Sequence, residues 1–490
     1  MLRTQTIRAQ SGLLGLAKRQ RRAIMGQASR KEGDISAVFR SLSGGEDVPL
    51  PPRFADIKRS LLERSAGREA LQESWNRLLE KLAYETAHIK ANRATIIPEI
   101  DFADIGSPSE AFNEAFRKRG IAVVRKVVPE KEARGFKSEL EEYIQANPST
   151  KSFPAENPAV FELYWSRPQM IGRTHPNMLK AQAFLMSYYH SKDPDAEVST
   201  AQPLVYADRL RIRQPGDAGF ALGPHVDSGS VERWEDEGYG RGGVYNEVLR
   251  GRWESFDPWE TSTRLNAVSD LYQGAGSCSM FRMFQGWLSL SHTSPGEGTL
   301  QVNPLFNLAT AYYLLRPFFA PRGGDPLSAS AWTLEESTTP ALQGAEPGLC
   351  QELNETWHPH LDLANTMVHV PHIAPGDYVA WHCDTIHGVD KVHAGKSDSS
   401  VLYIPSCPVT KASIDYVQQQ RAHFETGIPP VDFPGGVGES AHVGRPTTKD
   451  LKALASYEGL RGFGYAPFDV SAAKSEGERA VLEYGNSKLP

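Results

Sequence analysis

Two short motifs far apart in the chain constrain the fold, because the residues in them can act together only if the fold brings them to one place. Residues 223–227 read Gly-Pro-His-Val-Asp, and residues 376–387 form a Gly-Asp turn and an apolar, strand-like run that ends at His387. On a strand, side chains two positions apart point to the same face, so His225 and Asp227 can face one ion together. With His387 they make a 2-His-1-carboxylate set, which is typical of non-haem Fe(II) sites with open coordination positions.

A second His-x-Asp pair lies inside the downstream motif. His382 and Asp384 precede His387 by a few residues. All three would then come from one short segment, and the alternation of a strand does not wrap them around one face of an ion. We therefore expect His382 and Asp384 to have a structural role.

The composition excludes several classes of protein. The 490 residues carry a formal net charge of -6, with no broad basic surface for nucleic acid, and the four cysteines form no CxxC pair. No apolar run approaches the roughly 18 residues of a membrane-spanning helix. We expect a protein of a reducing compartment, without nucleic-acid or membrane partners; the length leaves the domain count open, and nothing in the sequence indicates the oligomeric state.

The N-terminal third divides into two parts. Residues 1–31 are basic and carry no acid before residue 31, so they are either a disordered tail or a transit segment. The first alternative predicts a cytoplasmic protein and the second a mitochondrial one. Residues 32–110 are predicted to be a helical extension, because leucines and Trp75 recur at three and four positions between residues 51 and 94.

The chain then changes to a pattern of strands and turns. Residues 119–128 have the β-branched density of a strand, and Pro129 opens a predicted helix. Further strand signals between Gly, Pro, Ser and Asp punctuation cover residues 204–212, 279–290, 299–302, 377–381 and 400–404. This spacing predicts a mainly β fold with α-helices, an antiparallel jelly roll over residues 111–470. We expect a surface excursion at 323–347 and a C-terminal tail at 471–490.

An insertion interrupts this predicted domain at about residues 228–278. It is rich in aromatic residues, glycines and charges, and Trp234 lies nearest in sequence to the ligands. The insertion is either a lid or substrate wall, with Trp234 as the candidate contact, or a loop that packs its own aromatics onto the barrel. The second reading is favoured.

These motifs occur in an order that resembles a known superfamily. Residues 286–304 add a strand and a Gly-Thr-Leu turn before a proline, between the two ligand motifs. Together they resemble the Fe(II)/2-oxoglutarate-dependent oxygenases, and residues 120–132 are similar to the phytanoyl hydroxylase branch. More narrowly, the chain looks like the YbiU-like proteins of bacteria and fungi, a domain family of undefined function. The segments that carry this closer likeness are 33–35, 51–56, 98–104 and 398–405, and the resemblance spans roughly residues 31–470.

The resemblance implies a double-stranded β-helix, the cupin-like jelly roll, with flanking helices. It implies that His225, Asp227 and His387 hold Fe(II) and that 2-oxoglutarate chelates the metal as cosubstrate. Molecular oxygen and a small-molecule substrate would be the other reactants, and the reaction would be a hydroxylation or oxidation. The protein positions these groups and excludes competing reactions.

The sequence departs from the superfamily at one point. The arginine that usually binds the distal carboxylate of 2-oxoglutarate follows the second histidine, but residues 396–401 read Lys-Ser-Asp-Ser-Ser-Val. Arg211 and Arg213, which share one face of the strand before the His-x-Asp motif, are the first candidates to replace it, because a guanidinium matches a carboxylate bidentately. The alternatives are an outward basic stripe and Arg282 on another predicted strand. Ser399 and Ser400 could donate hydroxyl hydrogen bonds to the same carboxylate.

Two other functional classes stay open. A cupin-like hydrolase or isomerase could use the same three ligands with zinc or manganese and bind an anionic substrate through the arginines. A barrel that binds a metal or small anion without catalysis is the third.

Overall fold

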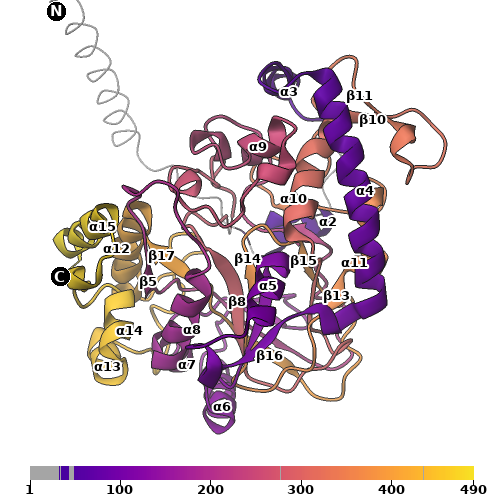
Figure 1. Ribbon diagram of the computed structural model, residues 1–490. Coiled ribbons are helices and arrows are strands. Elements are labelled where there is room, and N and C mark those ends of the chain that lie inside the picture. Colours follow the sequence, from indigo (N-terminus) through magenta and orange to yellow (C-terminus); the bar gives the residue numbers. More distant parts are fainter. Residues whose placement is uncertain (1–32, 34, 44–48, 276, 434, 490) are drawn as a thin grey trace, which may run out of the picture.

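The computed structural model describes the chain except for residues 1–32, 34, 44–48, 276, 434 and 490. The predicted tail or transit segment at 1–31 therefore lies outside the described residues. The described chain is a mixed α/β structure with several sheets (Figure 1). No described helix is both long and apolar enough to cross a lipid bilayer.

The larger sheet has eight strands and contains most of the predicted β segments. Its central strand β14 (Tyr378–His382) runs antiparallel to both β2 and β8. Such an uninterrupted apolar run is expected of a strand buried on both faces. On one side of β14 lie β2 (Ile121–Arg125) and then β1 (Glu99–Asp101). On its other side lie, in spatial order, β8 (Phe284–Ser289), β16 (Ser399–Tyr403), β6 (Leu210–Arg213), β4 (Val160–Phe161) and β3 (Ser152–Phe153).

The smaller sheet has five short strands and carries both ligand motifs. Its order is β12 (Gln351–Glu352), β7 (His225–Val226), β15 (His387–Val389), β9 (Leu300–Val302) and β13 (Val368–His369). In the antiparallel register of β15 and β7, His387 pairs directly with His225. Directly opposite residues on neighbouring strands point to the same face, so the sheet places both imidazoles together.

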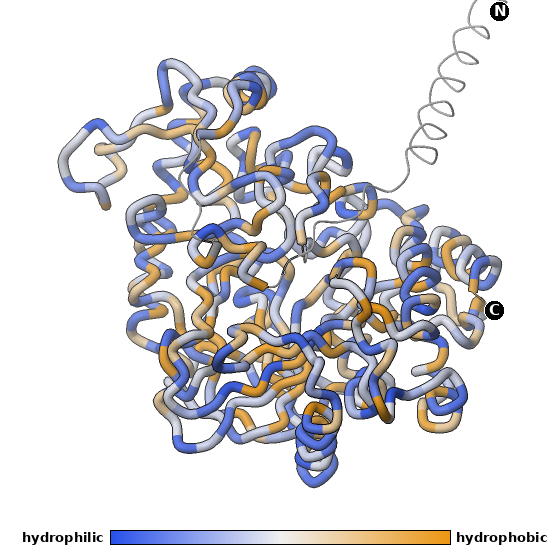
Figure 2. The backbone as a smooth tube through the Cα atoms, turned by 180° about the vertical axis from the view of Figure 1, so that it is seen from behind, coloured by the Kyte–Doolittle hydropathy of each residue, from blue (hydrophilic) through white to orange (hydrophobic). Residues whose placement is uncertain are grey.

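The two sheets pack face to face. Leu300 and Val302 of the smaller sheet belong to one buried cluster with Trp287, Val379 and Val401 of the larger sheet. Figure 2 shows hydrophobic backbone concentrated along these central strands and hydrophilic segments on the outer helices and loops. The predicted jelly roll is a more specific fold than this arrangement establishes, because the described strands form open sheets and no closed barrel.

Helices cover the outer face of the larger sheet. Leu288 and Leu402 point away from the smaller sheet into a second cluster with Phe116 and Phe136. Phe116 comes from α5 (Glu110–Arg119) and Phe136 from α6 (Glu130–Ala146), the helix predicted after Pro129. Two further helices on this side are α7 (Arg167–Thr174) and α8 (Pro176–Met186). Because both faces are covered, the strands carry apolar residues at consecutive positions.

Two long helices form the predicted N-terminal extension. They are α3 (Arg53–Glu63) and α4 (Arg68–Asn92), which runs along one side of the molecule (Figure 1). Trp75 of α4 is fully buried and stacks on Tyr312 of α10 (Phe306–Leu315) and on Phe319. The leucine and tryptophan stripe of the sequence is therefore core packing.

The insertion at 228–278 folds onto this helical side. Its short helices are η4 (Val231–Arg233), η5 (Tyr239–Arg241), α9 (Asn246–Leu249), η6 (Trp253–Ser255) and η7 (Ser262–Arg264). Trp234, Tyr245 and Phe256 are buried in the cluster that also contains leucines of α4. The insertion thus packs its own aromatics, as the favoured interpretation expects.

The C-terminal region is a group of helices on the side away from α4 (Figure 1). It contains α12 (Lys411–Thr426), α13 (Thr448–Leu454), α14 (Tyr457–Gly462) and α15 (Glu476–Lys488). Val481 and Leu482 of α15 are fully buried in one cluster with Val417 of α12. Residues 471–490, expected to be a tail, therefore contain a packed helix.

The remaining elements are short. The predicted surface excursion contains one strand of the hairpin β10 (Phe319–Pro321) and β11 (Trp332–Leu334). A second two-stranded ladder joins β5 (Ser199–Leu204) to β17 (Cys407–Val409). The other short helical segments are η1 (Ile35–Val38), α2 (Arg40–Ser43), η2 (Arg93–Ile96), η3 (Phe102–Asp104), η8 (Arg316–Phe318), η9 (Ala329–Ala331), η10 (Pro359–Leu361), α11 (Leu363–Thr366) and η11 (Val470–Ala472).

Candidate metal centre

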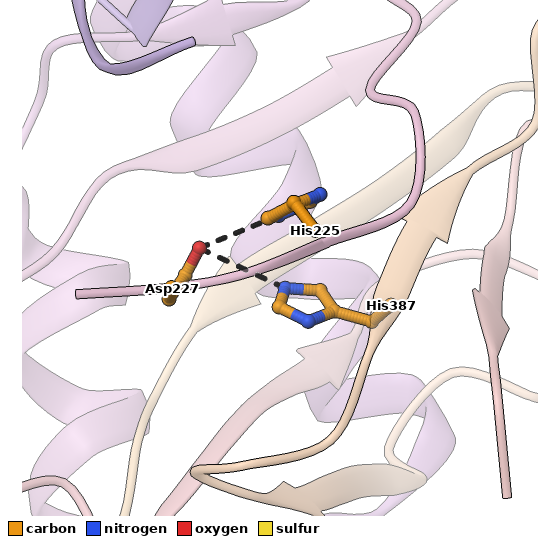
Figure 3. Close-up of side chains that lie close together, drawn as sticks. All are labelled: His225, Asp227 and His387. Carbon is orange, nitrogen blue, oxygen red and sulfur yellow. Dashed lines mark ion pairs between the residues drawn. The ribbon is translucent and has the colours of Figure 1, made fainter. Parts of the chain in front are cut away.

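The structure brings His225, Asp227 and His387 together on the inner face of the smaller sheet (Figure 3). Oδ1 of Asp227 lies 3.3 Å from Nε2 of His225 and 3.8 Å from Nε2 of His387. One ligand atom of each residue lies within 4.8 Å of the other two. These atoms can therefore contact one ion at the same time.

Backbone carbonyls fix which nitrogen of each imidazole is free. Nδ1 of His225 lies 2.7 Å from the carbonyl oxygen of Gly223, and Nδ1 of His387 lies 3.1 Å from that of Thr385. A carbonyl oxygen only accepts, so each Nδ1 carries the proton and each Nε2 presents a lone pair. Two lone pairs and a carboxylate oxygen then face one another without a donor between them. That acceptor set fits a cation.

The protonation states suit a metal as well. Burial raises the pKa of the Asp227 carboxyl, but His225, His387 and Arg282 lower it more, and the pKa lies well below its usual range. Burial, and to a smaller extent the neighbouring His225, lower the pKa of His387 to about 3. At neutral pH the structure therefore offers an ionised carboxylate and a neutral imidazole, the forms that metals bind.

A cavity of about 120 Å³ opens beside the three ligands. On the same measure one water needs roughly 10–15 Å³, so the cavity can hold a small organic molecule. Asp227 is the most open of the three ligands, with 30% of its side chain exposed against 2% for His225. The ligands are therefore reached from the cavity, and the other sides are closed by protein.

Arg211 reaches this cavity from β6 in the larger sheet. Its side chain donates one hydrogen bond, from Nη2 to Oγ of Ser399 at 3.2 Å, and its buried Nε has no partner among the described residues. Burial lowers the pKa of its guanidinium, and the charge of Arg213 lowers it further. Arg211 is a buried cation without a carboxylate partner in the described structure.

Arg282 lines the same cavity on the side of the ligands. Its Nη2 lies 3.5 Å from Oδ2 of Asp227, and its guanidinium lies 5.7 Å from the ring centroid of Tyr206. Within the described part of the chain it donates no closer hydrogen bond. A third cavity arginine, Arg209, pairs with Asp208 at 3.3 Å. Among the described cavity arginines, Arg211 thus has no carboxylate partner, and Arg282 shares its carboxylate, Asp227, with the candidate ligand set.

A segment near the N-terminus closes the cavity. Residues 35–43, which we call the N-terminal strap, comprise η1 and α2. Its Phe39 lies edge-on against the His225 ring at a centroid distance of 4.7 Å, and Ile35 and Val38 also line the cavity. Arg40 pairs with Glu346 at 2.5 Å, and the carbonyl of Val38 accepts a hydrogen bond from the amide of Cys350.

Comparison with known proteins identifies the family of this chain. The Gig2-like family model matches residues 48–465. This chain belongs to the Gig2-like family. The uncharacterized protein YbiU of Escherichia coli K12 is 33% identical over 398 residues, which cover 78% of this chain and 90% of YbiU.

Solved structures agree with this Gig2-like assignment. GlcNAc Inducible Gene 2 (GIG2, DUF1479) of Candida albicans is 31% identical with a TM-score of 0.80, and the match covers 90% of this chain and 96% of that chain. A protein of Salmonella typhimurium LT2, provisionally named an oxidoreductase, is 29% identical with a TM-score of 0.74, covering 86% and 99%. The predicted likeness to YbiU-like proteins is confirmed.

Several predicted site residues of this Gig2-like chain lie outside the cavity lining. Arg213 donates a hydrogen bond from Nε to Asp217 at 2.6 Å and is fully buried. Ser399 supports Arg211, whereas the hydroxyl of Ser400 donates to Asp398. Trp234 donates from its ring nitrogen to the carbonyl of Leu314 and is buried in the core. The structure therefore gives Arg213, Ser400 and Trp234 structural contacts.

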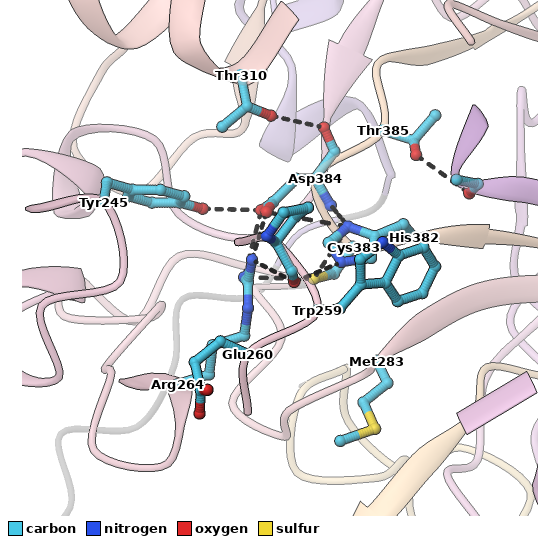
Figure 4. A network of polar contacts seen from close by, with 12 residues as sticks. Tyr245, Trp259, Glu260, Arg264, Met283, Thr310, His382, Cys383, Asp384 and Thr385 are labelled. Carbon is cyan, nitrogen blue, oxygen red and sulfur yellow. Dashed lines mark hydrogen bonds and ion pairs between the residues drawn. The ribbon is translucent and has the colours of Figure 1, made fainter. Parts of the chain in front are cut away.

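The second His-x-Asp pair forms a separate buried network (Figure 4). Nη2 of Arg264 lies 2.5 Å from Oδ2 of Asp384, and the hydroxyl of Tyr245 donates to Oδ1 at 2.7 Å. His382 stacks on Tyr189 with its Nε2 3.0 Å from the carbonyl of Pro258. One ligand atom each of His382, Cys383 and Asp384 also lies within 4.8 Å of the other two, so this group is a second candidate cluster for an ion. Its carboxylate is already neutralised by Arg264, whereas that of Asp227 lies beside the cavity.

Sequence reasoning missed two groups beside the ligands. Arg233 donates to the carbonyl of Asp227 at 3.1 Å and also to that of Gly229, while Tyr239 and Tyr313 flank its guanidinium. It holds the backbone that carries the carboxylate ligand. The N-terminal strap is the other group. An arginine in a charged insertion and a short apolar segment far upstream carry no signal in the sequence that links them to the site.

Proposed function

We propose that the protein is an Fe(II)/2-oxoglutarate-dependent dioxygenase that hydroxylates or oxidises a small molecule. His225, Asp227 and His387 would hold the iron, because they offer the 2-His-1-carboxylate set, with the carboxylate of Asp227 ionised and the imidazole of His387 neutral. When bound, iron and 2-oxoglutarate supply the chemistry in which decarboxylation of the cosubstrate by molecular oxygen drives oxidation of the substrate.

The observation that carries this proposal is the unpaired charge of Arg211. An isolated charge is costly to bury, so a guanidinium without a carboxylate partner points to an anionic ligand. The distal carboxylate of 2-oxoglutarate suits the two-pronged donor of Arg211. Ser399 orients the guanidinium through its hydroxyl. This arrangement would replace the arginine that the sequence lacks after His387.

The arrangement of the sheets supports a jelly roll of the double-stranded β-helix type. Two largely antiparallel β layers, in which only β1 and β2 of the described larger sheet pair in parallel, share one core, and the ligands come from neighbouring strands that face it. The name given to the Salmonella relative agrees with an oxidation, although that name belongs to that protein.

The remaining residues of the cavity position the reactants and exclude water. Trp381 packs on His387 at a ring-centroid distance of 5.1 Å, and Phe39 closes the side of His225. Apolar rings against ligand histidines fix the imidazole planes and keep solvent from the metal.

An anaerobic titration tests the proposal. Fe(II) and 2-oxoglutarate added to the apoprotein should produce the weak visible charge-transfer band of the chelate, and oxygen should release succinate. Arg211→Met should weaken 2-oxoglutarate binding by about tenfold or more, as expected for loss of a charge-assisted pair, and leave Fe(II) content unchanged. Arg167→Met, on the exposed arginine of α7, is the matched control.

The result also separates the other classes. A wild-type protein that binds Fe(II) but shows no band with 2-oxoglutarate would contradict the proposal and favour a hydrolase, an isomerase or a metal-binding barrel. Unchanged 2-oxoglutarate affinity in Arg211→Met would overturn the role of that arginine.

A further inference from the structure

We infer that the primary substrate is an organic monoanion whose charged group binds Arg282 and whose apolar body lies against the N-terminal strap. This inference rests on the proposed function and names the substrate class of the same cavity. It starts from the second cavity arginine, which the binding of 2-oxoglutarate to Arg211 leaves unused.

Arg282 lies beside the ligands, and no described residue accepts a short hydrogen bond from its guanidinium. Its side chain is 12% exposed and ends in the cavity, and its nearest acceptor is Oδ2 of Asp227 at 3.5 Å. A divalent ion on Asp227 takes over the neutralisation of that carboxylate. In the metal-loaded protein Arg282 would therefore lose most of its nearest counter-charge and become a free donor next to the reaction centre.

The charges of the cavity lead to the same conclusion. Arg209 and Asp208 form a pair and cancel. Arg211, Arg282 and a divalent ion oppose the single charge of Asp227, which leaves three positive charges. The 2-oxoglutarate dianion neutralises two of them. One positive charge remains in a closed cavity, where an unpaired charge is costly, and a substrate with one negative charge would balance it.

The position of Arg282 assigns that charge to the substrate. Arg282 lies within ion-pair distance of the ligand Asp227, whereas Arg211 makes no described ion pair with any of the three ligands. A molecule anchored on Arg282 is held next to the ligands, where the carbon to be oxidised must lie. Arg211 remains for the distal carboxylate of the cosubstrate.

The side chains that line the cavity indicate the chemical character of the rest of the substrate. Ile35, Val38 and Phe39 of the N-terminal strap and Leu222 and Trp287 supply apolar and aromatic surface around the ligands. Such surface favours a hydrocarbon or aromatic body over a sugar or nucleoside. An aryl or alkyl carboxylate therefore fits both the charge and the lining.

Two matched probes test the inference in the protein loaded with Mn(II) and 2-oxoglutarate. Benzoate carries the proposed charge and ring, and benzamide has the same shape without the charge. Calorimetry should show benzoate binding to the loaded wild type and benzamide binding about tenfold or more weakly, in keeping with loss of a charge-assisted hydrogen bond. Arg282→Met should abolish this preference for benzoate, and Arg282→Lys should retain part of it.

The reciprocal variant separates the two arginines. Arg211→Met should weaken 2-oxoglutarate and leave benzoate affinity within about threefold of wild type, measured at saturating 2-oxoglutarate. Arg282→Met should show the opposite pattern. Equal binding of benzoate and benzamide, or full benzoate preference in Arg282→Met, would overturn the inference and leave the proposed function intact. Failure of wild type to bind 2-oxoglutarate would instead refute the proposed function.

A measurement on wild type keeps the inference testable if Arg282→Met does not fold. A crystal of the Mn(II) and 2-oxoglutarate complex soaked with 4-bromobenzoate locates the bromine by anomalous scattering and the carboxylate by density. The carboxylate should lie on Arg282 and the bromine toward the N-terminal strap. A carboxylate on Arg211, or at any place outside the cavity, would contradict the inference.

Discussion

Each ligand at the candidate metal centre depends on a neighbouring group that holds it in place. The carbonyl oxygens of Gly223 and Thr385 accept hydrogen bonds from Nδ1 of the two histidines, and Arg233 donates to the backbone carbonyl of Asp227. These contacts set the direction of all three ligand atoms before any ion binds. Such supporting groups typically alter metal affinity by about 10- to 100-fold.

Loss of one ligand should therefore abolish iron retention. His225→Ala leaves two ligands, too few to hold Fe(II) through gel filtration, and elemental analysis should find iron near background. His292→Ala is the matched control, because His292 is exposed and lies outside the cavity lining. Iron content in His225→Ala equal to that of wild type would refute the ligand assignment.

At the residue scale, the sequence identified groups whose role follows from local spacing. His225 and Asp227 lie two apart on a strand, and that period alone predicts a shared face. The choice between Arg211 and Arg213 depends on tertiary contacts, because both share a face of β6 and only Arg213 donates to the carbonyls of Asp390 and Lys391. Phe39 and Arg233 act through contacts far apart in the chain, which no local pattern reveals.

At the scale of elements, apolar runs were sufficient to find the central strands. β14 and β16 lie within a residue of the predicted segments, since strands covered on both faces are apolar throughout. The segment predicted as one strand at 204–212 instead contains the last residue of β5, a stretch outside both strands, and the first three residues of β6. Between the two strands, the side chain of Gln420 donates to the backbone carbonyl of Val205 and accepts from the backbone amide of Ala207. These backbone groups are therefore not available for hydrogen bonds to a neighbouring strand.

The N-terminal strap is an element whose contacts are separable from the main core. Phe39 packs in a small cluster with Phe220 and Leu222, and Arg40 with Glu346 ties the strap to the chain before β12. Few anchors of this kind permit local opening at a lower free energy than global unfolding. Opening of the strap would give a substrate access to the ligands.

Removal of the Phe39 ring should release the strap without unfolding the protein. In Phe39→Ala, limited proteolysis followed by mass spectrometry should show faster cleavage within residues 35–43, whereas Phe39→Leu, which keeps most of the apolar contact, should resemble wild type. The global free energy of unfolding should fall by less than the roughly 3–5 kcal/mol typical of a core Phe→Ala change. A loss of that full size would show that the strap is part of the main core.

At the scale of the whole molecule, the fold buries histidines that must stay neutral. His358 is fully buried, and its Nδ1 accepts a hydrogen bond from the amide of Asn354. Burial, and to a smaller extent the charge of Arg316, lower its pKa to about 3. Burial also lowers the pKa of His382 to about 3 and that of His360 to about 4. In the unfolded chain these groups titrate near pH 6.5.

Acid should therefore destabilise the protein through these groups. Because the folded pKa of His358 lies below the unfolded value, its contribution to stability is complete above about pH 6.5 and is lost as the pH falls toward 3. Each such histidine contributes a slope of up to about 1.4 kcal/mol per pH unit in that window. His358→Gln, which keeps an acceptor for the Asn354 amide, should flatten the pH dependence of urea unfolding of the apoprotein by up to that amount. An unchanged slope in His358→Gln would mean that His358 is already protonated in the folded state.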